Sequence, residues 1–126
     1  MHLLNGYEPS AIKEAIKLLE NGDIVAFPTE TVYGLGADTF NPYAVAKIFE
    51  AKKRPRFDPL IVHIGEQDWV FDLAERVPPE AEKLIDAFWP GPLTIILKKK
   101  DVVPDIVTAG LQTVGIRMPS HPVALN

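Results

Sequence analysis

A group of hydrogen-bonding side chains follows the first apolar stretch of the sequence. Residues 28–36 (PTETVYGLG) come directly after the apolar run 24–27, and loops at strand ends are where α/β proteins bind ligands. Threonine and tyrosine hydroxyls and a carboxylate could form hydrogen bonds there, and Gly34 and Gly36 allow close backbone approach. Two interpretations remain open: a ligand-binding loop, or a structured turn. No Walker motif and no G-x-G-x-x-G turn occurs, so a nucleotide site would be built in another way.

Basic residues are concentrated between positions 47 and 56. On a regular helix Lys52 and Arg54 would diverge, but Pro55 favours an extended Arg54, which would let both cations reach one cavity. Phosphate oxygens are the natural partners of such a pair. The alternative is a basic helix end that interacts with the helix dipole. Against the single acid Glu50, the cluster contains Lys47, Lys52, Lys53, Arg54 and Arg56.

Two candidate strands carry polar side chains opposite their apolar ones. In LIVHI the alternation separates His63 from the core-facing residues, and in TVGIR it puts Thr113, Gly115 and Arg117 on one face. A hydroxyl, an absent side chain and a guanidinium describe a floor with room for a ligand, which would explain a glycine in a strand. The alternatives are a merely solvated or hydrogen-bonded histidine and an edge strand with a solvent-facing arginine. No second histidine or acid stands at metal-ligand spacing, so no metal site is predicted.

Helices with clear boundaries would position these residues. Residues 8–21 form a predicted helix that ends at Asn21-Gly22. A second helix is predicted to begin with Asn41 as its cap and Pro42 in its first turn, and to end by Pro55. A third follows Pro78-Pro79, with one predicted apolar stripe made of Ala81, Leu84, Ile85 and Phe88.

Strands are predicted at residues 24–27, 60–64, 93–97 and 113–118, so that helices and strands alternate in a mixed α/β class around one sheet. The segment WPGPLT at residues 89–94 is interpreted as mainly structural. Its two prolines stiffen a turn, and Trp89 and Phe88 are expected to bury area beside it.

Bulk properties are those of one globular domain of 126 residues, with 47% hydrophobic and 24% charged residues. A cytoplasmic location is expected, because the sequence shows no cysteine, no secretory signal and no apolar run long enough for a membrane span. The net charge of −4 argues against a generally basic nucleic-acid-binding surface. Residues 123–125 resemble the first turn of a further helix, so a truncated, partial domain is expected over residues 1–126.

Five segments, taken in order, resemble the YrdC-like family, to which threonylcarbamoyl-AMP synthases belong. No single segment is decisive, but together they cover nearly the whole chain. The resemblance implies an α+β fold in which a twisted mixed sheet is flanked by helices, with a large cavity on one side, here incomplete at the C-terminus. The segments are PTETVYGLG (28–36), KKRP (52–55), PLIVHI (59–64), WPGPLT (89–94) and TVGIRMP (113–119).

The resemblance also implies a reaction: L-threonine, bicarbonate and ATP give threonylcarbamoyl-adenylate and pyrophosphate, with Mg²⁺ expected on the phosphates. The product would supply the threonylcarbamoyl group for an adenosine in tRNA. Family contacts place Thr31, His63 and Arg117 in the threonine site. They place Lys52 and Arg54, as the catalytic cations, in the ATP site together with Thr113 and Asp58. For Asp58 a backbone contact is expected, since a carboxylate would repel phosphate.

The family's Ser-x-Asn motif and its last strands lie beyond Asn126. Weak ATP binding, no useful turnover and association of chains through open sheet edges are therefore expected. Three alternatives remain: a module that binds tRNA or double-stranded RNA, a carbamoyl-transfer domain of a hydrogenase-maturation protein, and an inactive fragment. The net charge disfavours the first. The short segment before the first helix disfavours the second.

Overall fold

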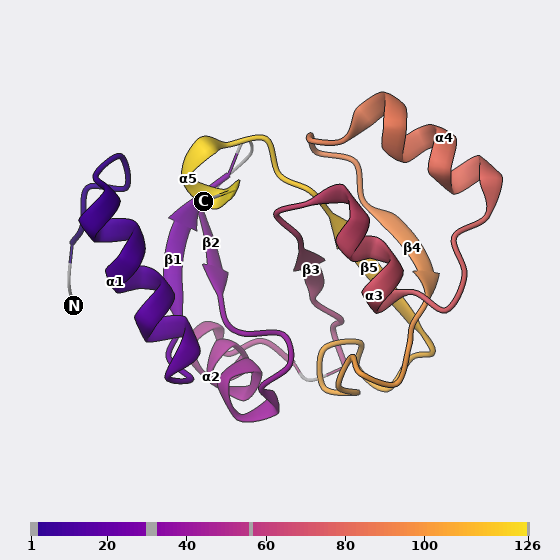
Figure 1. Cartoon of the computed structure of the whole chain (residues 1–126). Helices are drawn as coiled ribbons and strands as arrows, with labels where there is room; N and C mark the ends of the chain where they lie inside the picture. The colour runs from indigo at the N-terminus through magenta and orange to yellow at the C-terminus, as the bar shows by residue number, and fades with distance from the viewer. Residues whose placement is uncertain (1–2, 30–32, 56, 126) are drawn as a thin grey trace.

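Helices and strands are mixed along the chain (Figure 1), but they do not strictly alternate as the sequence predicts, because strands follow strands and a helix follows a helix in places. The structure is a computed structural model that describes residues 3–29, 33–55 and 57–125. Its elements are α1 (Pro9–Glu20), β1 (Val25–Pro28), β2 (Tyr33–Gly36), α2 (Pro42–Lys52), β3 (Ile61–His63), the 3-10 turn η1 (Gln67–Trp69), α3 (Val70–Leu73), α4 (Pro79–Phe88), β4 (Ile95–Lys98), β5 (Thr113–Arg117) and α5 (Pro122–Leu125).

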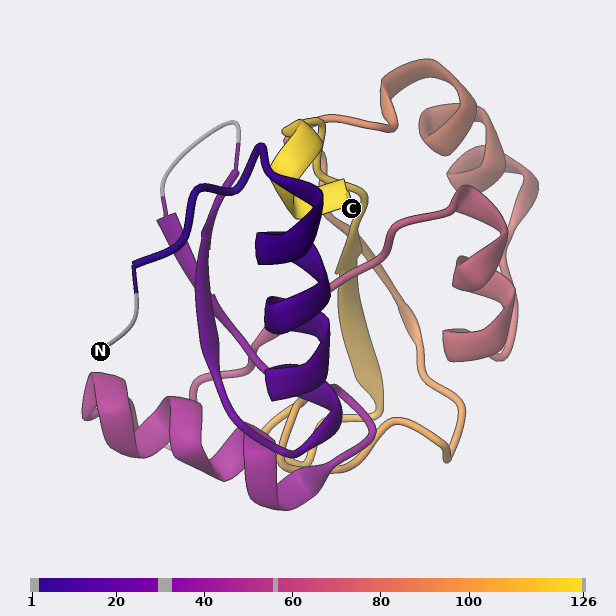
Figure 2. The ribbon, with the colours of Figure 1, turned by 60° about the vertical axis from the view of Figure 1, so that its left-hand side comes forward.

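The predicted α+β class is confirmed, but the expected single twisted sheet is wrong for the described residues. β1 and β2 form an antiparallel pair, and β3, β5 and β4 form a separate mixed sheet in that order. The two sheets meet through side chains instead of backbone hydrogen bonds, since the ring of Phe27 on β1 lies edge-on to the ring of His63 on β3 at 6.3 Å. α1 covers β1, whereas α3 and α4 lie beside the three-stranded sheet (Figure 2).

The segment after β1 is partly a strand, which the sequence did not suggest. Residues 33–36 pair with β1 in the register Phe27↔Gly34 and Val25↔Gly36. Glycine is a poor strand former, but at Gly36 an added Cβ would lie 2.4 Å from the ring of Phe27. The glycine therefore leaves room for that ring, and residues 33–36 are a strand, which neither of the two interpretations of this segment includes.

Two helices begin and end close to the predicted residues. Glycine at position 22 has φ +86° and follows the C-cap of α1, as expected. Asn41 caps α2, because its side-chain oxygen accepts hydrogen bonds from the backbone N–H groups of Tyr43 at 3.1 Å and Ala44 at 3.2 Å. These caps fix where α2 starts and hence where its basic last turn lies.

Replacing Asn41 with alanine is expected to lower the free energy of unfolding by about 1 kcal/mol, because two N–H groups at the start of α2 lose their acceptor. Asn41→Asp keeps an acceptor oxygen and is the matched control. Urea unfolding followed by circular dichroism measures both. Equal midpoints for wild type and Asn41→Ala would contradict the role given to the cap.

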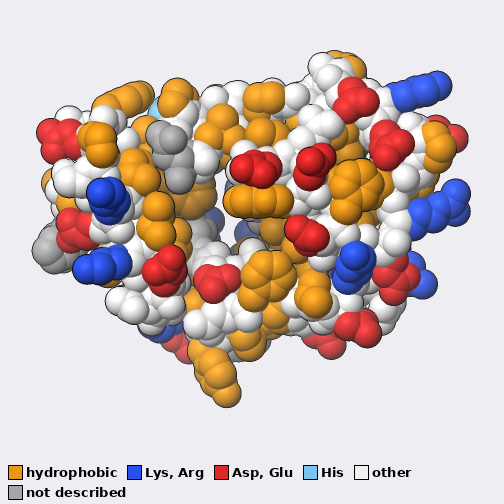
Figure 3. All heavy atoms as spheres, viewed as in Figure 1, with side chains coloured by type: hydrophobic (Ala, Val, Ile, Leu, Met, Phe, Trp, Pro, Cys, Tyr) orange, Lys and Arg blue, Asp and Glu red, His pale blue; other side chains and the backbone are white. Residues whose placement is uncertain are grey.

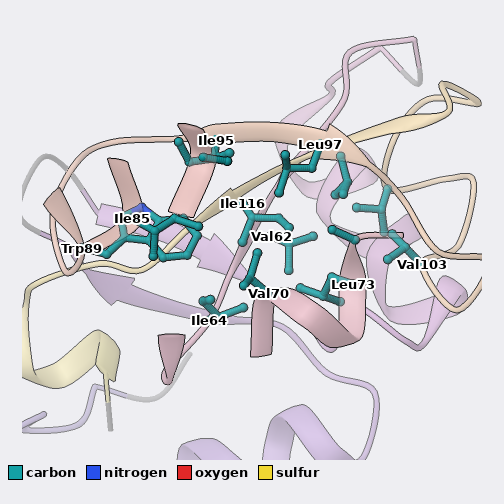
Figure 4. Close-up of a cluster of buried hydrophobic side chains, with 14 of the residues drawn as sticks. Val62, Ile64, Val70, Leu73, Ile85, Trp89, Ile95, Leu97, Val103 and Ile116 are labelled. Carbon is teal, nitrogen blue, oxygen red and sulfur yellow. The ribbon is translucent and has the colours of Figure 1, made fainter. Parts of the chain in front are cut away.

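The apolar core lies between the three-stranded sheet and the helices α3 and α4 (Figure 4). Val62, Val114 and Ile116 point into it, as strand alternation predicts, and none is more than 4% exposed. The predicted stripe of α4 is half wrong: Ala81 and Ile85 are buried, whereas Leu84 and Phe88 are 43% and 56% exposed. α4 covers the sheet with a narrow line of side chains because it lies at the rim of the domain.

Among the residues that the structure describes, no helix combines the length and the apolar character that crossing a membrane requires.

Candidate functional site

The face of the three-stranded sheet opposite the core carries the predicted ligand-binding side chains. β3 runs parallel to β5, and β4 runs antiparallel to it. Side chains of paired residues stand on the same face. His63 on β3 is paired with Arg117 on β5, and Thr113 at the start of β5 is paired with Lys98. The buried partners on these strands point the other way, so this polar face is the open one.

His63, Arg117 and Thr94 form a row across this face. Ile95 is paired with Ile116, which places Thr94 opposite Arg117. The Nε–H of Arg117 donates a hydrogen bond of 3.2 Å to the hydroxyl of Thr94. The sequence does not point to Thr94 as a site residue, because the interpretation of WPGPLT is structural. The strand register that brings Thr94 to Arg117 cannot be read from the sequence. Its position directly before an alternating strand was the available signal.

A side chain at position 115 would press on neighbouring protein atoms. Gly115 lies in the next row of the open face, paired with Ile61 and Ile96. A Cβ at this position would lie 3.2 Å from the methyl carbon of Thr94 and 3.8 Å from a side-chain carbon of Ile61. The glycine thus makes room for Thr94 beside Arg117, and the ligand floor stays a prediction.

The last turn of α2 leads toward the same sheet. Lys53 adopts the left-handed conformation with φ 52°, and the N–H of Arg54 then bonds the carbonyl of Phe49 at 2.9 Å. The helix is thus ended by a left-handed residue followed by a six-to-one hydrogen bond, one residue before Pro55. Arg54 leaves the helix direction, as the sequence predicts, while Lys52 remains on the last turn and is exposed.

The guanidinium of Arg54 lies against the segment that enters β3. Its Nη2 donates to the carbonyl of Pro59 at 2.9 Å, and its Nε lies 3.5 Å from the carbonyl of Asp58. Asp58 thus presents its backbone to a cation, and its carboxylate is not in that contact. Thr113 stands at the start of β5, next to the start of β3. The strands rise about 3.3 Å per residue, so Arg54 and Thr113 lie at one end of the face and His63 and Arg117 lie at the other.

The cations of the predicted site have no acid partner among the described residues, a feature that they share with other basic residues such as Lys17, Lys53 and Arg76. In the described part of the chain, Lys52, Arg54 and Arg117 form no ion pair. Lys47 pairs with Asp23 at 3.3 Å, so the charge of this member of the predicted basic cluster is balanced by an acid. The remaining ion pairs are Lys98 with Glu75 and Lys99 with Asp105. Cations without acid partners are suited to bind an anionic ligand.

A hollow separates the β1–β2 half from the three-stranded sheet, with Lys or Arg side chains visible at its back (Figure 3). A cavity of about 410 Å³ opens at the edge of β3 and reaches the loop after β2 and the helix α3. Of the predicted site residues that are described, His63 is the one that lines it, beside Asp38, Phe40 and Trp69. The predicted groups thus share a sheet face and its adjoining helix end, not the wall of one enclosed pocket.

The predicted role of Thr31 and the question of a metal site remain to be considered. Thr31 lies outside the described residues. Over residues 3–29, 33–55 and 57–125, no three His, Cys, Asp or Glu side chains come together in a way that could hold a metal ion.

Comparison with known proteins identifies the family. The model of the Sua5/YciO/YrdC family, described as "Telomere recombination", matches residues 17–126. The chain is similar to the threonylcarbamoyl-AMP synthase of Pyrococcus abyssi, with 53% identity over 91% of the chain and 34% of the relative. The chain is also similar to the threonylcarbamoyl-AMP synthase of Bacillus subtilis, with 55% identity over 90% of the chain and 33% of that relative.

The fold agrees with this match. A crystal structure of P. abyssi Sua5 complexed with L-threonine superimposes with a TM-score of 0.90 at 48% identity, over 98% of this chain and 36% of that one. The chain therefore spans about a third of the length of these relatives. The matched region includes the sheet, the end of α2 and the row of His63, Arg117 and Thr94. The chain belongs to the Sua5/YciO/YrdC family.

Proposed function

We propose that this chain carries the amino-acid site and part of the nucleotide site of a threonylcarbamoyl-AMP synthase. In that reaction L-threonine, bicarbonate and ATP give threonylcarbamoyl-AMP, pyrophosphate and water. The observation that carries the proposal is the row on the open sheet face, where Arg117, a cation without an acid partner among the described residues, stands beside His63. Relatives named threonylcarbamoyl-AMP synthase and a Sua5 structure with L-threonine support the choice of substrate.

Arg117 would bind the carboxylate of L-threonine. Its Nε is engaged by Thr94, which leaves the Nη groups to donate two parallel hydrogen bonds to the carboxylate oxygens. His63, one strand away on the same face, would contact the amino acid from the side. Thr31 is proposed as a further contact of the same substrate.

Lys52 and Arg54 would bind the phosphates of ATP. Lys52 offers a mobile point charge, and Arg54 offers a planar group held at the entry to β3 by the carbonyl of Pro59. The hydroxyl of Thr113 would contact the nucleotide at the same end of the sheet. For Asp58 we propose a backbone contact with the nucleotide, since its carboxylate would repel the phosphates.

The chemical step needs positioned charges and no protein nucleophile. A carbamate oxygen of N-carboxy-threonine forms a bond to the α-phosphorus, and the bond between that phosphorus and the bridging oxygen of pyrophosphate breaks. This transfer of an adenylyl group makes the proposed enzyme a nucleotidyltransferase. Lys52 and Arg54 would stabilise the charge that grows on the phosphate oxygens. Mg²⁺ would be held by the phosphate oxygens, since the described residues offer it no cluster of protein ligands.

The wider partners follow from the product. An activated threonylcarbamoyl group needs an acceptor, and we propose an adenosine in tRNA, reached directly or through a modification complex. The edge of β3 away from β5 pairs with no strand among the described residues, so it remains the proposed route to self-association.

Pyrophosphate release tests the proposal. We expect release, however slow, only when L-threonine, bicarbonate and ATP are all present, and saturable L-threonine binding in calorimetry even without ATP. Serine and L-allo-threonine serve as matched amino acids with the same carboxylate. A chain that binds neither L-threonine nor ATP at millimolar concentrations, or that releases pyrophosphate without an amino acid, would refute the proposed function.

A further inference from the structure

We infer that Thr94 is a positioning residue that orients the Arg117 guanidinium and so dictates how the amino-acid carboxylate is bound. The inference rests on the proposed function of Arg117 and adds to it a residue and a binding geometry. It is carried by a contact between two segments far apart in sequence, the turn that precedes β4 and the end of β5.

The first observation is the hydrogen bond itself. The hydroxyl oxygen of Thr94 accepts from the Nε–H of Arg117 at 3.2 Å, and both residues are half-buried. An arginine can bind a carboxylate side-on through Nε and one Nη, or end-on through both Nη groups. Because Thr94 occupies Nε, the side-on mode is blocked and the end-on mode is left. The flat group is also kept from rotating about its last torsion angles.

The second observation is that the turn carrying Thr94 is fixed on both sides. The indole N–H of Trp89 donates to the carbonyl of Leu93 at 2.8 Å, and the N–H of Gly91 donates to the carbonyl of Met118 at 2.8 Å. Trp89 is itself buried in the core. These two hydrogen bonds fix the turn at Leu93, directly before Thr94, and at Met118, directly after Arg117. The hydroxyl of Thr94 is therefore held in place and can orient the guanidinium.

The third observation explains Gly115. The methyl group of Thr94 occupies the space where a side chain at position 115 would stand, with a Cβ-to-methyl distance of 3.2 Å. That separation is shorter than an ordinary van der Waals contact. A larger residue at position 115 would displace Thr94 and, through it, Arg117. Thr94 thus matches its surroundings with both ends of its side chain, the hydroxyl toward Arg117 and the methyl toward Gly115.

Thr94→Val, which keeps the shape and removes the acceptor, tests the inference. We expect L-threonine binding, measured by calorimetry, to weaken roughly tenfold, with unchanged ATP binding and an unchanged unfolding midpoint. Thr94→Ser keeps the hydroxyl and is expected to bind within about twofold of wild type. L-threoninamide, which lacks the carboxylate, should bind wild type and Thr94→Val equally.

A double-mutant cycle separates this inference from the function on which it rests. In the Arg117→Met background, Thr94→Val should have no further effect on L-threonine binding. Gly115→Ala should weaken binding, and adding Thr94→Ser should restore part of it, because serine lacks the methyl group that the new Cβ meets.

Three results have distinct meanings. If Arg117→Met leaves L-threonine binding unchanged, the proposed carboxylate site is refuted. If Arg117→Met weakens binding but Thr94→Val does not, or if the two effects add, only the positioning role of Thr94 is overturned. If Thr94→Val lowers affinity for L-threonine and L-threoninamide alike, the effect is a general one of structure and the inference is also overturned.

Discussion

Replacing Arg117 with methionine is expected to weaken L-threonine binding by about two to four orders of magnitude. Methionine preserves most of the aliphatic stem but removes the guanidinium. The proposed carboxylate clamp consists of two charge-assisted hydrogen bonds, each of roughly 1.5–3 kcal/mol. No described acid competes for the guanidinium, so its charge is available to the ligand although its Nε is engaged by Thr94. Calorimetric titration with L-threonine measures the loss.

Arg76→Met is the matched control for this experiment. Arg76 is exposed on the segment between α3 and α4 and is not among the predicted site residues, so its replacement should leave L-threonine binding unchanged. Unfolding midpoints of both variants test whether the fold is intact. Equal L-threonine affinities of wild type and a folded Arg117→Met variant would show that Arg117 does not bind the carboxylate.

Replacing both Lys52 and Arg54 with methionine is expected to lower ATP affinity by roughly two orders of magnitude, with Lys52→Met alone giving about tenfold. Both losses should shrink as salt rises, since they arise from charge. L-threonine binding should change little, because neither residue is among its proposed contacts. Fluorescence titration with a labelled ATP analogue at two salt concentrations measures the effect.

Lys17→Met distinguishes phosphate binding from an interaction with the helix dipole. Lys17 occupies the last turn of α1, as Lys52 occupies the last turn of α2, so both stabilise a helix C-terminus in the same way. Only Lys52 is proposed to bind phosphate. If Lys52→Met and Lys17→Met have the same small effect on stability and neither affects ATP, Lys52 is an ordinary helix-end lysine and the nucleotide assignment fails.

Local sequence signals predicted the helix caps and the faces of the strands well. Asn41 and the Asn21-Gly22 stop lie where short-range rules put them, because capping depends on residues within one turn. The alternation in TVGIR correctly separated the buried Val114 and Ile116 from Thr113 and Arg117. These features depend only on neighbours in sequence.

Features that depend on strand register could not be predicted. Residues 33–36 form a strand because β1 supplies their hydrogen-bonding partners, whereas their own composition is that of a loop. Thr94 reaches Arg117 only because β4 pairs with β5 in one register. Similarly, nothing near Gly115 in the sequence shows that the methyl of Thr94 fills the space above it.

The surface of α4 and the end of α2 show a second limit of prediction from sequence. Periodicity placed Leu84 and Phe88 on a buried stripe, but burial depends on how much of the helix the sheet covers, and both are exposed. Pro55 correctly indicated where α2 stops. The left-handed Lys53 that turns the chain is a non-glycine residue, which turn propensity does not suggest.

An NMR titration of the isotope-labelled chain tests the central claim most directly, since it reports which residues meet each ligand. L-threonine is predicted to shift the amide signals of His63, Gly115 and Arg117. Of the signals followed, the indole signal of Trp89 is predicted to shift least. ATP is predicted to shift those of Lys52, Arg54 and Thr113. Shifts confined to α1 and α4, or saturating L-threonine that leaves both His63 and Arg117 unmoved, would contradict the placement of the amino-acid site on the open face of the three-stranded sheet.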